Sequence, residues 1–133
     1  MKILVIDAQG GGVGKALITR LRKEFPDSEI LAVGTNSAAT NAMLKAGADR
    51  GATGENPIRV LVDKVDVITG PIGIIIADAM MGEITAAMAN AVSSSDTRKV
   101  LIPFQKCGTM IAGVKDLKLA DLIEEAVRAI RDL

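Results

Sequence analysis

Hydrophobic residues along the chain follow two periods that alternate. Continuous apolar runs rich in β-branched residues predict buried strands, and apolar positions recurring every three to four residues predict amphipathic helices. Strands are predicted over 2–7, 29–34, 49–53, 65–69 and 99–104, with 109–114 as an additional edge strand. Helices are predicted over 12–24, 38–46, 56–64, 74–92 and 119–131, the fourth either continuous or broken at Gly82.

Strictly alternating strands and helices predict an α/β fold. Short connections between them favour parallel strands, with helices on both faces of the sheet. We therefore expect residues 1–133 to form a single three-layer, Rossmann-like domain with a mostly parallel sheet. The expected strand order is 3-2-1-4-5, with the extra strand at an edge.

Composition limits the kinds of partner that the chain is expected to bind. The chain has 16 basic and 16 acidic residues and only two aromatic rings, Phe25 and Phe104, so no nucleic-acid partner is expected. No apolar run is long enough to span a membrane, so no membrane partner is expected. Cys107 is the single cysteine, and no secretory leader precedes the first strand. These features predict a cytoplasmic protein.

The absence of His, Tyr and Trp limits the available chemistry. Acid–base catalysis near neutral pH most often uses His, so here it would fall to Asp, Glu, Lys or Cys. A His-based metal site is impossible, and no metal ligands are assigned. Asp7, Lys15, Glu55 and Cys107 are the reactive groups that can be placed near predicted strand ends, although a structural role is favoured for Cys107.

Two glycine-rich turns carry the strongest functional signal. The first, residues 10–14, joins the first strand to a helix, and the second, residues 70–73, follows the fourth strand. Strands one and four are neighbours where the expected strand order reverses, and ligands bind at that crevice in open parallel sheets. Glycine turns also let backbone N–H groups surround a phosphate at a helix N-terminus. We therefore predict a small phosphorylated ligand there.

The candidate binding residues come from these turns and from the end of the second strand. They are Gly10, Gly11, Gly12, Val13, Gly14, Lys15, Thr35, Asn36, Gly70, Pro71 and Gly73. Gly11 and Gly14 are expected to approach the ligand or a helix too closely to allow a side chain. Asp7 either holds a metal or caps its own loop, and the cap is favoured. A Walker A loop is disfavoured because Ala16 replaces the hydroxyl residue that binds magnesium.

The run Gly-Gly-Gly-Val-Gly-Lys-Ala-Leu over residues 10–17 resembles the nucleotide-binding turn of short-chain and extended dehydrogenases. The resemblance covers about the first 35 residues and implies NAD(P) or another nucleotide as cofactor. The Tyr–Lys catalytic pair of that family is absent because the chain has no Tyr. The end of the second strand, residues 34–37, also lacks the acidic residue or Arg that selects NAD or NADP.

The whole chain resembles a family of short bacterial proteins classed as a domain of unknown function. The matching segments include Val-Ile-Asp-Ala-Gln-Gly-Gly-Gly over 5–12 and Gly-Pro-Ile-Gly-Ile-Ile-Ile-Ala over 70–77. This resemblance implies a Rossmann-like fold and brings no activity or catalytic residues with it. Because of the two glycine-rich turns, binding of a nucleotide, dinucleotide or phosphorylated metabolite is the leading hypothesis. A small enzyme and a ligand-free oligomeric scaffold remain as alternatives.

A homo-oligomer is predicted from the segment 74–92. Read as a helix, this segment is apolar on nearly every side, and Met80, Met81 and Met88 lie within it. A monomer cannot easily bury every face of such a helix, so an ordinary core competes with a subunit interface.

Overall fold

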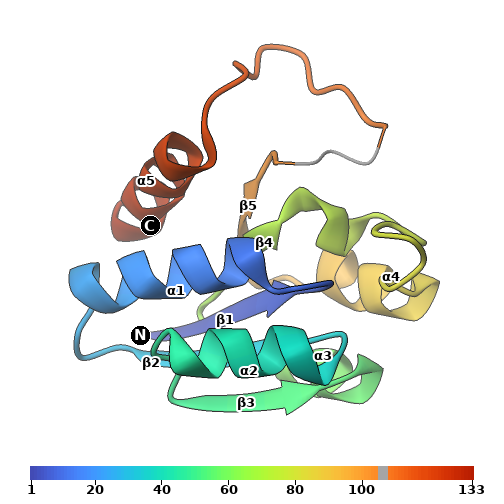
Figure 1. Cartoon of the computed structure of the whole chain (residues 1–133), viewed down its shortest axis with the longest axis horizontal. Coiled ribbons are helices and arrows are strands. Elements are labelled where there is room, and N and C mark those ends of the chain that lie inside the picture. Colours follow the sequence, from blue (N-terminus) through green and yellow to red (C-terminus); the bar gives the residue numbers. More distant parts are fainter. Residues whose placement is uncertain (105–107) are drawn as a thin grey trace.

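The computed structural model describes residues 1–104 and 108–133. Five parallel strands form one sheet in the order β3-β2-β1-β4-β5, which confirms the predicted fold class (Figure 1). The strands are β1 (Lys2–Asp7), β2 (Glu29–Gly34), β3 (Arg50–Thr53), β4 (Val67–Pro71) and β5 (Arg98–Ile102). The helices are α1 (Gly12–Glu24), α2 (Ser37–Lys45), α3 (Glu55–Leu61), the 3₁₀ turn η1 (Ile72–Ile75), α4 (Ala86–Ser94) and α5 (Leu119–Arg131).

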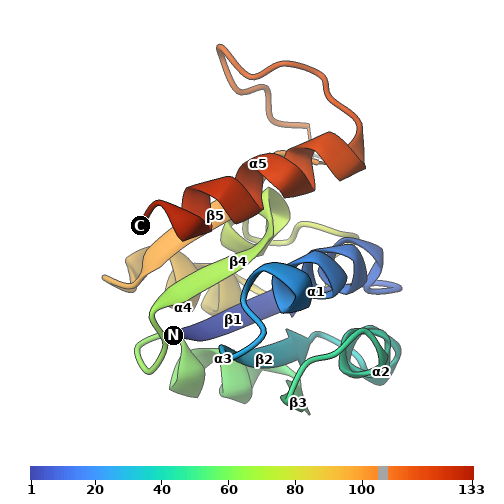
Figure 2. The same ribbon diagram turned by 90° about the vertical axis from the view of Figure 1, so that its left-hand side faces the viewer.

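Two hydrophobic cores lie on opposite faces of the sheet. Alternate residues of β1 divide between them, since Ile3 and Val5 join one core and Leu4 and Ile6 the other. Helices α1, α2 and α5 cover the first face, and α3, η1 and α4 cover the second (Figure 2). The central strands are therefore buried on both sides, as their unbroken apolar runs predicted.

Two sequence predictions are wrong. Residues 74–92 do not form one helix, because η1 ends at Ile75 and α4 begins only at Ala86. Asp78, Met80 and Met81 in the intervening connection all have positive φ, a conformation that no α-helix contains. The predicted edge strand over 109–114 is also absent. That segment lies on the connection that rises away from the sheet in both views (Figures 1 and 2).

Strand register brings the ends of β1, β2 and β3 to one edge. Asp7 pairs with Gly34, and Gly34 pairs with Thr53. The β1–α1 turn, the β2–α2 turn and the connection after β4 therefore meet at the carboxyl edge of the sheet. In this topology, the crevice at that edge is where a ligand is expected.

Candidate functional site

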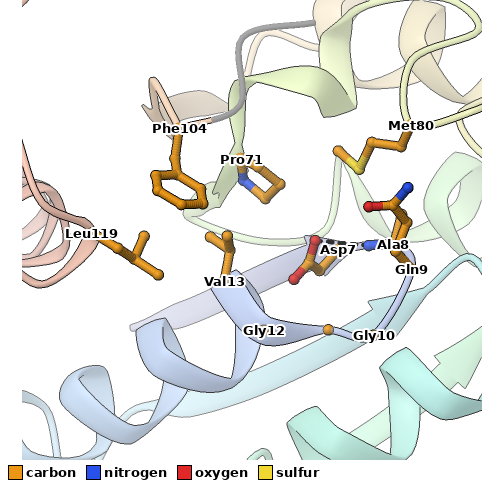
Figure 3. Close-up of a pocket in the computed structure, with 11 residues that line it drawn as sticks. Asp7, Ala8, Gln9, Gly10, Gly12, Val13, Pro71, Met80, Phe104 and Leu119 are labelled. Carbon is orange, nitrogen blue, oxygen red and sulfur yellow. Dashed lines mark hydrogen bonds between the residues drawn. The ribbon is translucent and has the colours of Figure 1, made fainter. Parts of the chain in front are cut away.

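A cavity of about 290 Å³ lies at the carboxyl edge of β1 and β4. One part of its wall is the β1–α1 turn and the other part is apolar. The lining residues are Asp7, Ala8, Gln9, Gly10, Gly11, Gly12, Val13, Pro71, Met80, Phe104 and Leu119. In the view of Figure 3, Val13, Pro71, Phe104 and Leu119 lie to one side of the Asp7 carboxyl, and Met80 and Gln9 lie to the other.

The Asp7 carboxyl caps helix α1 from the end of β1. The N-cap residue of α1 is Gly11, which has no side chain to accept a hydrogen bond. Asp7 replaces it: Oδ2 accepts the Gly14 N–H at 2.7 Å, and Oδ1 accepts the Ala8 N–H at 2.7 Å. A carboxylate at this position also interacts favourably with the positive end of the helix dipole. This contact agrees with the favoured interpretation of Asp7 as a cap.

Burial has the largest influence on the pKa of this carboxyl. Asp7 is 3% exposed, and the loss of solvation raises its pKa above the ordinary value of 3.8. The hydrogen bonds from Gly14 and Ala8 act in the opposite direction, and the charge of Glu83 adds to the increase. Among the described residues, no Lys or Arg lines the cavity to offset the carboxylate.

The glycines of the β1–α1 turn fall into two groups. At Gly10 and Gly12, an added Cβ would meet nothing within 4 Å, and neither residue has positive φ. Gly11 has φ of 73°, and its Cβ would lie 3.0 Å from the Ala39 backbone. A Cβ at Gly14 would lie 2.5 Å from Met43 Sδ. Gly11 and Gly14 therefore allow close approach of α2, whereas Gly10 and Gly12 border open space.

Gly10 and Gly12 also supply donors. Within the described parts of the chain, their backbone N–H groups have no hydrogen-bond partner. Gly12 is the first residue of α1, where an N–H is free of intrahelical partners. Two N–H groups at the wall of a cavity can bind a phosphate or a carboxylate of a ligand.

Glu83 ties three loops together next to this cavity. Its Oε1 accepts hydrogen bonds from the Gln9 N–H at 2.8 Å, the Thr35 hydroxyl at 2.6 Å and the Asn36 amide at 2.9 Å. These bonds, that of Thr35 foremost, hold the pKa of Glu83 below its ordinary value of 4.5. Asn36 also donates to the Gln9 carbonyl oxygen and caps α2 through the Ala39 N–H.

Comparison with known proteins gives the family. The chain matches the domain of unknown function DUF3842 over residues 2–133. The protein belongs to this family. No curated protein matches the chain.

Solved structures with a similar fold share little sequence with this DUF3842 chain. AibC is 19% identical, with a TM-score of 0.51 over 98% of this chain and 38% of its own. The Escherichia coli heptosyltransferase WaaC with ADP is 14% identical, with a TM-score of 0.54 over 97% of this chain and 46% of its own. A dodecameric FMN-dependent UbiX-like decarboxylase from E. coli O157:H7 is 19% identical, with a TM-score of 0.48, over 99% and 75%. The chain thus spans less than half the length of the first two proteins, and the similarity establishes the fold.

The structure divides the predicted binding residues among four surroundings. Gly10, Gly11, Gly12, Val13 and Pro71 line the cavity with Asp7. Gly14, Gly70 and Gly73 are buried. Lys15 lies in a different groove between α1 and α5, and Thr35 and Asn36 contact Glu83.

Three of the four groups considered for catalysis, Asp7, Lys15 and Glu55, are described by the structure, and these do not gather at one place. Glu55 accepts a hydrogen bond from the Thr85 hydroxyl at 2.6 Å and does not line the cavity. Cys107 lies outside the described residues. Asp7 is therefore the one member of the set that the structure places in the cavity wall.

The methionines predicted to form an interface have three different surroundings. Met88 is 5% exposed and belongs to the core, Met80 lines the cavity, and Met81 is 96% exposed. They do not share one helical face, which removes the basis of the proposed interface, and the homo-oligomer stays a prediction. No helix in the described parts of the chain is long and apolar enough to cross a membrane. Nor do three or more possible metal ligands cluster among those residues.

Sequence analysis missed Glu83, Phe104 and Leu119. Phe104 and Leu119 reach the cavity from the two ends of the connection between β5 and α5. Glu83 lies 74 residues from Gln9 and 47 from Asn36 along the chain. No local pattern reports such a contact. The available signal was Thr85, the N-cap of α4. A helix that begins after Thr85 leaves Glu83 in the preceding connection.

Proposed function

We propose that the protein binds a nucleotide or a phosphorylated metabolite in the cavity at the β1–α1 turn. The observation that carries the proposal is a pair of N–H groups, those of Gly10 and Gly12, that have no partner among the described residues and lie in the wall of a cavity at the carboxyl edge of β1 and β4. The phosphate would accept these N–H groups at the start of α1. A base or another apolar group would pack against Phe104, Leu119 and Met80.

Cavity size favours a compact ligand. Pockets for small molecules span roughly 300–1,000 Å³, and the cavity of about 290 Å³ is at the lower end of that range. A mononucleotide fits this volume better than a whole dinucleotide. Binding of a nucleotide on this fold has a precedent in the heptosyltransferase, whose structure was solved with ADP.

The negative charge of Asp7 lowers the affinity that we expect for a phosphate in the cavity. Its carboxylate already occupies the Gly14 N–H at the start of α1, so a phosphate must bind beside it, through Gly10 and Gly12. Two negative groups in one cavity repel each other, and the repulsion is stronger in a partly buried site than in water. We therefore expect modest affinity that increases when Asp7 is protonated.

The test uses a substitution that fills the cavity without straining the fold. Gly12→Val adds a side chain where a Cβ meets nothing within 4 Å, so the melting temperature should change little. AMP, ADP and inorganic phosphate are titrated by calorimetry against the wild type, Gly12→Val and the control Ala38→Val. Ala38 is exposed in the first turn of α2. At least one ligand should bind about tenfold more weakly to Gly12→Val than to the other two proteins. Equal affinities in all three proteins would refute the proposal.

A further inference from the structure

The carboxylate of Glu83 is held by three donors from two separate segments. The donors are the backbone N–H of Gln9, the hydroxyl of Thr35 and the side-chain amide of Asn36, at 2.6–2.9 Å from a single oxygen, Oε1. They come from the ends of β1 and β2, and Glu83 comes from the connection after β4. Three donors converging on one anionic oxygen have the geometry of an oxyanion site.

The segment that brings Glu83 there is strained. We define the cover loop as residues 76–85, between η1 and α4. Its residues Asp78, Met80 and Met81 have φ of 64°, 56° and 59°, a conformation that costs free energy in any residue except glycine. Hydrogen bonds inside the loop, such as Asp78 N–H to the Ile84 carbonyl at 2.7 Å, maintain its shape.

The cover loop is anchored at few points outside itself. Ala79 and Ile84 are buried in the core beneath it, and Glu83 provides its contact with the β1 and β2 turns. Met80 forms part of the cavity wall, on the same side of Asp7 as Gln9 (Figure 3). Displacing Glu83 would therefore free the three donors and remove the contact between the loop and the turns after β1 and β2.

From these contacts we infer that Gln9, Thr35 and Asn36 form an oxyanion-binding site, which Glu83 occupies when the cover loop is closed. A phosphate or carboxylate group of a ligand takes the place of the Glu83 carboxylate when the loop opens. The site uses donors other than the Gly10 and Gly12 N–H groups, so the inference does not rest on the proposed function. A ligand spanning both sets of donors would be larger than the closed cavity admits.

Removal of the Glu83 carboxylate tests the site. In Glu83→Ala the three donors lose their internal anion, so inorganic phosphate should bind at least about tenfold more tightly than to the wild type. Glu55→Ala is the matched control. Glu55 anchors the same loop through the Thr85 hydroxyl, and its removal changes the net charge equally without freeing the three donors. Glu55→Ala should therefore bind phosphate as the wild type does.

The double variant Glu83→Ala/Thr35→Val locates the binding. Val keeps the shape of Thr35 and removes its hydroxyl donor, so most of the gained affinity should disappear. Acetate, titrated at the same ionic strength, separates the two ligand classes: a gain for phosphate alone indicates a phosphate group, and a gain for both indicates any small oxyanion. Either pattern supports the site.

Glu83→Gln is a second variant that tests the site if Glu83→Ala does not fold. Its amide oxygen still accepts hydrogen bonds from the three donors, while the charge that competes with the ligand is gone. A smaller gain in phosphate affinity is expected for this variant. If folded Glu83→Ala and Glu83→Gln both bind phosphate and acetate no better than the wild type, or if Thr35→Val leaves the gain intact, the inference is wrong.

Discussion

The β1–α1 turn and the cover loop meet at the same edge of the sheet, yet they are built differently. The turn is short, and it has one non-glycine residue at positive φ, Gln9 at 52°, besides Gly11 at 73° just before α1. The cover loop places three non-glycine residues at positive φ. Asp7, buried and close in sequence, holds the turn, whereas Glu83, partly exposed and remote in sequence, holds the loop.

This difference separates a rigid wall from a movable one. The turn is fixed by its own backbone and by the core beneath it, so its donors at Gly10 and Gly12 are preorganised. The cover loop is tied to the turns after β1 and β2 through one carboxylate, that of Glu83, and contains three non-glycine residues at positive φ. We therefore expect the turn to define where a ligand binds, and the cover loop to define which ligands can enter.

The largest expected effect compares one glycine from each of the two glycine-rich turns. A Cβ at Gly70 would lie 2.2 Å from the Ile6 carbonyl oxygen, and φ there is 151°. Gly70→Ala should therefore lower the free energy of unfolding by roughly 4 kcal/mol or more, in the range of severe core substitutions. In Gly12→Ala the added Cβ meets open space in the first turn of a helix, so the free energy of unfolding should rise by up to about 1 kcal/mol.

Urea unfolding of the two alanine variants beside the wild type measures this contrast. Similar midpoints for Gly70→Ala and Gly12→Ala would show that the glycines of the two turns serve the same purpose. The distinction between packing glycines and cavity glycines would then have to be abandoned.

The fold could be predicted from the sequence because it depends on local patterns. The unbroken apolar run of β1 and the stripe of α1 are each visible within a few residues, and the parallel order follows from their alternation. The first glycine turn was identified for the same reason. The close approach predicted at Gly11 and Gly14 agrees with the structure, but the element that approaches them could not be predicted, because Ala39 and Met43 come from α2.

The cover loop shows where sequence patterns fail. An apolar run such as 74–77 is compatible with a helix, a strand or a buried loop, and its composition does not distinguish them. The loop is determined by the anchors Ala79 and Ile84 and by the bonds of Glu83 to distant turns. The predicted strand over 109–114 failed similarly, since its β-branched residues have no neighbouring strand with which to pair.

The effect of intermediate size is the pH dependence of stability, which should have opposite signs for the carboxylates of Asp7 and Glu83. Burial raises the folded-state pKa of Asp7, so the stability that Asp7 contributes is fully present below its ordinary value of 3.8 and is lost as pH rises through the raised pKa. The wild type should therefore lose stability relative to Asp7→Asn as pH increases from about 3.8. Glu83 has a lowered pKa, so its contribution is present above 4.5 and is lost as pH falls.

Thermal unfolding of the wild type, Asp7→Asn and Glu83→Gln across this pH range tests both signs. The two differences from the wild type should slope in opposite directions with pH. Parallel slopes would mean that the two carboxylates have equivalent environments, contrary to the contrast drawn between the turn and the cover loop.

The smallest effect tests strain in the cover loop. Met81 has φ of 59° and is 96% exposed, so its side chain contributes little packing. Met81→Gly should remove about 1–2 kcal/mol of conformational strain and cost about 0.5–1 kcal/mol in chain entropy, a net stabilisation of up to about 1.5 kcal/mol. Met110, 94% exposed without positive φ, is the control, and Met110→Gly should be neutral or destabilising. A loss of stability in Met81→Gly as large as that in Met110→Gly would argue against stored strain.

The central claim is that the N–H groups of Gly10 and Gly12 receive the ligand. The most direct measurement is a ¹H–¹⁵N spectrum of the wild-type protein during titration with AMP, ADP or inorganic phosphate, in which glycine amides are well separated. The account predicts that the amides of Gly10 and Gly12 shift more than those of the buried glycines Gly14 and Gly70, with one common saturation curve. Saturable shifts confined to another part of the protein, or unchanged Gly10 and Gly12 amides with every ligand, would contradict it.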